Sequence, residues 1–176
     1  KIIVGYDGRL TSPKLQLALC EGLLNSGVDV LNIGICPTPM TYFVHHYLNT
    51  EAAIMVTGSH NPSEYNGFKM VLNKNSFYSE DIQKLQKLID KKILSKGSGV
   101  IEEKDFRNQY VSRNLVNINI KKKLKVAWDI GNGAMGTVMD ILINKMKNVD
   151  NIIINKDVDG TFPNHHPDPT VPENMT

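Results

Sequence analysis

A serine lies in a polar loop that directly follows a short apolar run, Ala-Ala-Ile-Met-Val. The loop, residues 57–62, has the sequence Thr-Gly-Ser-His-Asn-Pro. Gly58 permits a tight turn in which backbone N–H groups can approach an anion, and His60 and Asn61 place further donors beside the hydroxyl of Ser59. Such a loop can hold a phosphoryl group, either as a ligand or as a covalent phosphoserine. Phosphoryl transfer is therefore one chemistry that this segment can support.

Two other interpretations of the loop are open at this point. The first is a polar turn without chemistry, because glycine, serine, asparagine and proline are common turn residues. The second is a serine hydrolase, because His60 adjoins Ser59. A nucleophile elbow, however, needs glycines two residues before and after the serine, where Thr57 and Asn61 stand. Adjacent side chains on a strand also point apart, so the hydrolase pattern is not met.

Two clusters near the C-terminus could also do chemistry. Residues 131–136, Gly-Asn-Gly-Ala-Met-Gly, match the dinucleotide fingerprint G-x-G-x-x-G, and Asp150 stands near the place of the expected acidic residue. His165 and His166 beside Asp168 suggest a metal cluster. Consecutive histidines in a proline-rich loop rarely converge on one ion, so we expect a structural connection there instead of a zinc site.

The elements that must position Ser59 alternate between strand and helix patterns. Apolar runs predict strands at 1–6, 28–35, 52–56 and, with an antiparallel direction, 67–72. Helix patterns follow Ser12-Pro13 as far as Gly27, span 40–48, and begin again at 79–81. A second strand, turn and helix pattern covers 124–129, 137–146 and 149–154. Strands 1–6 and 28–35 should be parallel, because a helix connects them, and Ser59 then lies at the strand edge where α/β proteins usually bind ligands.

These patterns predict an α/β fold of two consecutive domains with mixed, mostly parallel sheets flanked by helices. We place the first domain at residues 1–104 and the second at 105–176, and we expect the second to be incomplete.

Composition excludes several classes of protein. The chain has 176 residues, of which 41% are hydrophobic, and 20 basic against 18 acidic residues give a formal charge of +2. That balance does not indicate a nucleic-acid partner, and the lysine run 121–123 is predicted to be a solvated linker. No apolar run approaches the roughly 20 residues of a membrane span, and no signal peptide pattern is present. Cys20 and Cys36 are too few for a disulfide framework or a zinc knuckle, which favours two core thiols and a cytoplasmic location.

The serine loop and residues 65–69, Tyr-Asn-Gly-Phe-Lys, together closely resemble the signature of the α-D-phosphohexomutase superfamily, in the branch of bacterial phosphomannomutase/phosphoglucomutase. Companion segments stand in the family's order, so the resemblance covers essentially the whole chain. They are Val-Gly-Tyr-Asp-Gly-Arg at 4–9 with Ser12-Pro13, Pro-Thr-Pro at 37–39, Asp-Ile-Gly-Asn-Gly at 129–133, and Asp-Gly-Thr-Phe-Pro-Asn-His-His-Pro-Asp-Pro at 159–169.

The resemblance implies a role for each residue of the loop. Ser59 would carry the phosphoryl group, and its phosphate oxygens would contact a Mg²⁺ ion. Lys69 would act as a general acid or base, or as a fixed cation beside the transferring group. His60 and Asn61 would organise the loop and the phosphate. Arg9 would either steady the loop or pair with a carboxylate.

The implied activity is the interconversion of hexose 1-phosphate and hexose 6-phosphate, with mannose or glucose as the sugar and a hexose 1,6-bisphosphate as intermediate and activator. This is an isomerase acting by intramolecular phosphoryl transfer on a small phosphosugar, without a nucleic-acid or membrane partner; the oligomeric state is left open. Two alternatives are a phosphoglucosamine mutase and a phosphosugar-binding domain without turnover. The family's Asp-Gly-Asp-x-Asp-Arg metal loop does not occur in this sequence, so we expect residues 1–176 alone to have little mutase activity.

Overall fold

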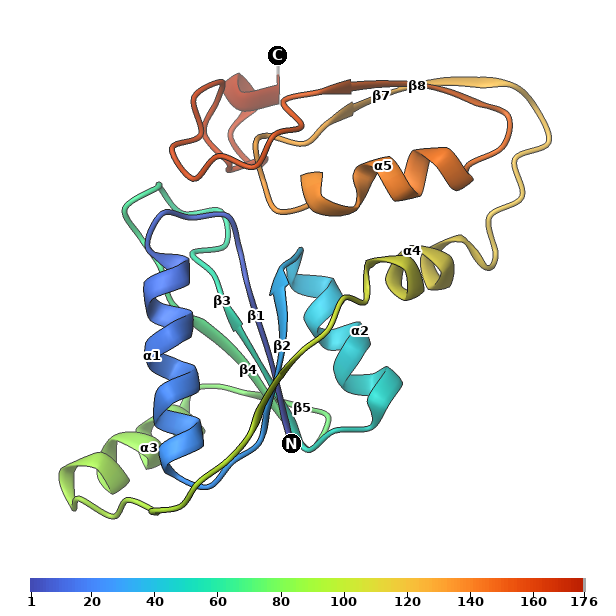
Figure 1. The fold of residues 1–176 in the computed structure, drawn as a ribbon. Helices are drawn as coiled ribbons and strands as arrows, with labels where there is room; N and C mark the ends of the chain where they lie inside the picture. The colour runs from blue at the N-terminus through green and yellow to red at the C-terminus, as the bar shows by residue number, and fades with distance from the viewer. Residues whose placement is uncertain (176) are drawn as a thin grey trace.

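The computed structural model describes residues 1–175 and contains two β-sheets (Figure 1). The larger sheet has six strands in the order β5-β4-β3-β1-β2-β6. These strands are β1 (Ile2–Tyr6), β2 (Val30–Ile35), β3 (Ala52–Val56), β4 (Phe68–Leu72), β5 (Asn75–Phe77) and β6 (Ile101–Glu103). The smaller sheet pairs β7 (Leu124–Asp129) with β8 (Val149–Ile154). The mixed, mostly parallel α/β fold that the sequence predicts is confirmed.

The centre of the larger sheet is parallel, and it sets the position of the serine loop. Strand β1 pairs in parallel with both β2 and β3, and Tyr6 lies opposite Ile35 on one side and Val56 on the other. Strand β4 runs antiparallel to β3, as predicted. The carboxyl ends of β1, β2 and β3 therefore meet at one edge, and the chain leaves that edge at Asp7, Cys36 and Thr57.

Helices cover both faces of the larger sheet. Figure 1 shows α1 (Ser12–Asn25) and α3 (Glu80–Asp90) on one side, and α2 (Thr38–Leu48) and α4 (Arg107–Leu115) on the other. The larger core cluster joins buried strand residues to residues of α2 and α4, among them Ile3, Leu31, Met40, Val44, Met55 and Val111. Strands such as β1 and β3 are continuous apolar runs because both of their faces are covered.

Helix boundaries differ slightly from the sequence-based prediction. Helix α2 begins at Thr38 with Pro39 in its first turn, two residues before the predicted start at Met40. A proline is compatible with that position because the N–H groups of a first turn have no partner within the helix. Ser12 is the first residue of α1 instead of its cap, and its hydroxyl donates to Asp7.

Three elements were not predicted. Strands β5 and β6 have only three residues each and lie at the two edges of the sheet. Helix α4 is largely polar, and Val111 is its buried residue. Short edge strands and a polar helix carry little apolar periodicity, so their sequences resemble loops.

The β7/β8 unit repeats the strand, helix, strand plan. The two strands are parallel with an unbroken register from Leu124 opposite Val149 to Asp129 opposite Ile154, and α5 (Gly136–Lys145) connects them. Val138 of α5 is fully buried in the same core cluster as Phe106, so this unit packs on the first through α4 and α5. A short 3₁₀ helix, Pro172–Met175, follows. The division at residues 104/105 stays a prediction.

Both thiols are core residues, as the sequence predicts. Cys20 is 3% exposed and Cys36 is fully buried. Burial raises the pKa of the Cys36 thiol to about 11, so this thiol stays protonated and unreactive. Among residues 1–175, no helix combines the length and the hydrophobicity that a membrane span requires.

Candidate active site

A cavity of about 1040 Å³ lies between the carboxyl edge of the larger sheet and the β7/β8 unit. The first unit contributes residues of the serine loop and its neighbours, and the second contributes the turn after β7 and the loop after β8. The residues that line the cavity include Ser59, His60, Lys69, Asp129, Asn132, Phe162, His165 and Asp168. The topology thus brings the predicted serine loop to a cleft that two units share.

Ser59 is held in a strained backbone conformation at this cleft. Its φ angle is 55°, in the left-handed region that residues with a side chain rarely adopt. The N–H of Ser59 donates to Thr57 Oγ1 at 2.9 Å, and the N–H of Asn61 donates to the Gly58 carbonyl at 3.1 Å. The residue itself is exposed. Strain of this kind persists only where the surroundings fix it, and it often marks a functional site.

Lys69 is brought to the serine by the pairing of β3 with β4. In that register Lys69 lies opposite Met55, and Met55 stands four residues before Ser59 in the sequence. Its Nζ donates to Ser59 Oγ at 3.1 Å. The two residues for which the sequence suggests a chemical role are therefore in direct contact, and a positive charge stands beside the hydroxyl.

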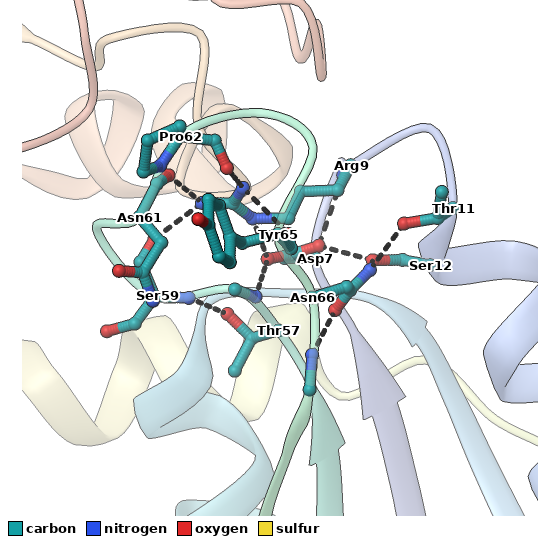
Figure 2. Close-up of polar contacts among 12 residues, drawn as sticks. Asp7, Arg9, Thr11, Ser12, Thr57, Ser59, Asn61, Pro62, Tyr65 and Asn66 are labelled. Carbon is teal, nitrogen blue, oxygen red and sulfur yellow. Dashed lines mark hydrogen bonds and ion pairs between the residues drawn. The ribbon is translucent and has the colours of Figure 1, made fainter.

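Arg9 is buried beneath the loop and holds four of its carbonyl groups. Nη1 donates to the carbonyls of Pro62 at 2.6 Å and Tyr65 at 3.1 Å, and Nη2 to those of Ser59 at 2.9 Å and Asn61 at 2.7 Å (Figure 2). All five N–H donors of a guanidinium are used once the bond from Nε to a carboxylate is added. Arg9 thus steadies the loop and pairs with a carboxylate at the same time.

That carboxylate is Asp7, which the sequence did not single out. Its Oδ2 accepts from Arg9 Nε at 3.2 Å and from the Gly58 N–H at 3.3 Å. Its Oδ1 accepts from the Ser12 hydroxyl at 2.5 Å and from the Arg9 N–H at 3.1 Å. Asn66 extends the network, because its Nδ2 donates to Ser12 Oγ at 2.8 Å (Figure 2). Asp7 and Asn66 belong to the segments 4–9 and 65–69 that resemble the family's motifs. That resemblance is the signal that could have identified them.

The two remaining loop residues, His60 and Asn61, are exposed, and of these two His60 lines the cleft. Asn61 contributes backbone groups to the loop, as described above. His60 lies close enough to Asp168 of the second unit to affect its charge. The pKa of Asp168 is lowered first by hydrogen bonds from Thr170, and further by the nearby imidazoles of His60 and His166. His60 is thus the residue of the serine loop that lies near the loop after β8.

The glycine turn after β7 does not form a dinucleotide site. Asp150 is the second residue of β8 and lies opposite Lys125, at the end of the strand away from the turn. The acidic residue of the dinucleotide motif must instead reach a ribose at the carboxyl ends of the strands. The ring of His165 also packs against Gly131, since a Cβ added there would lie 3.1 Å from its Cε1.

An ion pair joins that turn to the loop after β8. His165 Nε2 lies 3.1 Å from Asp129 Oδ2, and His165 Nδ1 lies 3.0 Å from the carbonyl of His166. Both ring nitrogens can therefore donate when the imidazole is protonated. The pKa of His165 is raised, first by the His166 carbonyl and then by Asp129. Burial raises the pKa of Asp129, but bonds from Gly131, Asn155 and His165 outweigh it, so the pKa is lowered.

The His165 ion pair makes a testable pH prediction. A raised histidine pKa stabilises the folded state at low pH, and this stability is lost as the pH rises through the folded pKa. A lowered aspartate pKa stabilises it at higher pH, and this stability is lost as the pH falls through the folded pKa. The pair should contribute most between about pH 4 and about pH 6.5. An NMR titration of the ring should give a midpoint above that of free histidine, and Asp129→Asn should lower it. An ordinary midpoint that Asp129→Asn leaves unchanged would contradict the pairing.

The described residues do not form a metal site by themselves. No group of three or more histidine, cysteine, aspartate or glutamate side chains in residues 1–175 is arranged to hold an ion. For Mg²⁺, Ser59 could supply only the oxygens of a bound phosphate, and Asp7 is already engaged by Arg9, Gly58 and Ser12. The donor set of residues 1–175 is therefore too small for Mg²⁺.

Comparison with known families decides the classification. Residues 1–96 match the model for phosphoglucomutase/phosphomannomutase, alpha/beta/alpha domain I, and residues 104–176 match the model for domain II. The chain belongs to the phosphoglucomutase/phosphomannomutase family. Relatives in this family include a phosphomannomutase/phosphoglucomutase of Pseudomonas aeruginosa, which is 40% identical over 174 residues, and a phosphoglucomutase of Neisseria meningitidis, which is 40% identical over 178 residues. Each comparison covers 99% of this chain.

Solved structures of the family agree with the fold. A phosphoglucomutase/phosphomannomutase family protein from Burkholderia thailandensis is 41% identical and superimposes with a TM-score of 0.92 over 99% of this chain and 40% of that chain. A putative phosphomannomutase from Thermus thermophilus, at 23% identity and a TM-score of 0.82, shares the fold. The chain spans 37% of the length of the Pseudomonas relative and 38% of that of the Neisseria relative.

Proposed function

We propose that Ser59 is the phosphoryl carrier of a phosphohexose mutase. The observation that carries the proposal is the contact of Lys69 Nζ with Ser59 Oγ at 3.1 Å, at the mouth of a cleft large enough for a phosphosugar. The relatives named phosphomannomutase and phosphoglucomutase support mannose and glucose phosphates as substrates. The full-length protein would interconvert the 1-phosphate and the 6-phosphate through a hexose 1,6-bisphosphate.

The arrangement suggests how the residues would act. A sugar hydroxyl attacks the phosphorus of phosphoserine 59, a new O–P bond forms, and the bond from phosphorus to Oγ breaks. Lys69 donates a proton to the departing Oγ and regains one from the sugar hydroxyl through solvent, so protons balance. Its positive charge also stabilises the negative charge on the transferring group. Arg9 holds the loop carbonyls and thereby fixes the direction of Oγ.

Several features of the full-length protein remain part of this proposal. Mg²⁺ would neutralise charge on the phosphate, with ligands beyond those that the described residues supply. A hexose 1,6-bisphosphate would phosphorylate Ser59 and activate the protein. The buried, unpaired thiols Cys20 and Cys36 support a cytoplasmic location.

Mass spectrometry tests the proposal directly. The full-length natural protein is treated with glucose 1,6-bisphosphate, and its intact mass is compared with that of an untreated sample. We expect the gain of one phosphoryl group, and fragmentation of the peptide that contains residues 57–69 should place it on Ser59. The neighbouring Ser63 serves as an internal control within the same peptide. A phosphoryl group on Ser63, or none on the peptide after treatment, would contradict the assignment. Phosphorylation without isomerisation of either hexose phosphate would favour a phosphosugar-binding protein without turnover.

A further inference from the structure

The guanidinium of Arg9 also contacts the second unit. Its Cζ lies 5.2 Å from the centroid of the Phe162 ring, in a cation–π arrangement. It also packs directly on Gly58, because a Cβ added there would lie 2.5 Å from Cζ and from Nε. Arg9 is 1% exposed. The side chain that holds the serine loop is thus in contact with Gly58 of that loop and with an aromatic ring from more than a hundred residues later.

The backbone around Phe162 is fitted closely to the turn that carries Arg9. A Cβ added to Gly160 would lie 2.6 Å from the Gly8 carbonyl oxygen and 2.7 Å from Arg9 Cα. A Cβ added to Gly8 would lie 2.1 Å from Val158 Cγ1. Such approaches are possible only because both positions are glycine. The two turns therefore touch through their backbones, and this contact leaves little freedom for one unit to move on the other.

Hydrogen bonds within the second unit hold the backbone of the turn that carries Phe162. The Phe162 N–H donates to the Asp159 carbonyl at 3.1 Å, and the Asp159 N–H donates to the Asn132 carbonyl at 3.0 Å. Thr161 donates its N–H and its hydroxyl to Asp159 Oδ1, at 2.8 Å and 2.7 Å. Phe162 itself has a φ of 51°, so its backbone is held in the left-handed region, as that of Ser59 is. A phenylalanine adopts this conformation only where its surroundings fix it.

We propose that Phe162 is a positioning residue that fixes the guanidinium of Arg9 on the serine loop, so that the second unit helps to set the direction of the Ser59 side chain. The Phe162 ring contacts the guanidinium of Arg9, and this guanidinium donates a hydrogen bond to the carbonyl of Ser59. The catalytic consequence rests on the function proposed above. The effect on loop mobility does not.

Three replacements of Phe162 separate positioning from simple packing. Phe162→Leu keeps an apolar side chain but removes the ring, whereas Phe162→Tyr keeps the ring. Replacement of Phe162 by a ring-fluorinated phenylalanine keeps the shape and weakens the attraction to a cation. Each protein is studied at full length by steady-state kinetics and by hydrogen exchange of residues 57–67. Tyr78→Leu, at an aromatic residue that is 67% exposed, is the matched control.

Phe162→Leu should lower kcat about ten-fold and change KM by less than about two-fold, because the ring acts on the direction of a reacting group and not on sugar binding. Exchange of residues 57–67 should become faster in the same variant. The fluorinated protein should also show a lower kcat and faster exchange of residues 57–67. Phe162→Tyr and Tyr78→Leu should behave as wild type. Unchanged kcat and unchanged exchange in Phe162→Leu would overturn the proposal, as would an equal loss with Phe162→Tyr. If the wild type lacked mutase activity, the proposed function would fail, and the exchange experiment would still decide whether Phe162 fixes the loop.

Discussion

Replacing Ser59 by alanine should abolish the phosphoryl gain and reduce mutase activity of the full-length protein by several orders of magnitude. The hydroxyl oxygen of Ser59 is the atom that would carry the phosphoryl group, and it is the hydroxyl that Lys69 Nζ contacts at 3.1 Å. Removal of a covalent nucleophile typically costs a factor on the order of 10⁶ in rate. The measurement is intact mass after treatment with a hexose 1,6-bisphosphate, together with the rate of isomerisation.

A second substitution at the same residue tests how much free energy its left-handed backbone conformation costs. Ser59→Gly should also abolish phosphorylation, but glycine adopts a φ of 55° without the clash of a Cβ. We therefore expect the loop to be more stable in Ser59→Gly than in Ser59→Ala by about 1 kcal/mol, as measured by hydrogen exchange of residues 57–67. Equal stability of the two variants would show that the left-handed conformation costs little. Phosphorylation of either variant at another residue would remove Ser59 from the proposed role.

Arg9→Met should be among the most destabilising substitutions in the chain. The change removes donors to four carbonyl groups and leaves the partly buried carboxylate of Asp7 without its cation. Breaking a buried ion pair by removing one partner typically costs about 3–5 kcal/mol, and the freed carbonyls add to the cost where water cannot reach them. Thermal unfolding of the full-length protein should show a lower midpoint. Phosphorylation of Ser59 should also become slower, because the loop loses the group that holds it.

The chain contains a close control for that experiment. Arg107 stands two residues after Asp105, as Arg9 stands after Asp7, and its Nη2 pairs with Asp105 at 2.7 Å. The Arg107 side chain is 44% exposed and that of Asp105 is 51% exposed, however. Exposed pairs contribute only about 0–1 kcal/mol, so Arg107→Met should leave the unfolding midpoint almost unchanged. Similar losses in both variants would mean that burial does not distinguish the two arginines.

The local patterns of the sequence determined much of the first unit. Strands β1 and β3 are short apolar runs bounded by turn residues, and the helix between β1 and β2 requires those strands to be parallel. These rules place residues 57–62 at the carboxyl edge of the sheet. The motifs around Ser59 then indicated the family, which the two domain models confirm. Elements with few apolar residues, such as β5, β6 and α4, carried no comparable signal.

The tertiary structure decided which partners the charged and aromatic residues contact. The sequence left Arg9 with two possible roles, because the burial of a charged side chain depends on partners more than fifty residues away. The pairing of β3 with β4 placed Lys69 beside the serine, although the family signature had already suggested this residue. Phe162 stands in the family-like segment 159–169, but nothing in the sequence linked it to Arg9; its ring reaches Arg9 because two turns from different units meet at Gly8 and Gly160. The sequence by itself thus determined where the serine loop, residues 57–62, begins and ends. Packing between distant segments, which local periodicity does not encode, decided how that loop is held.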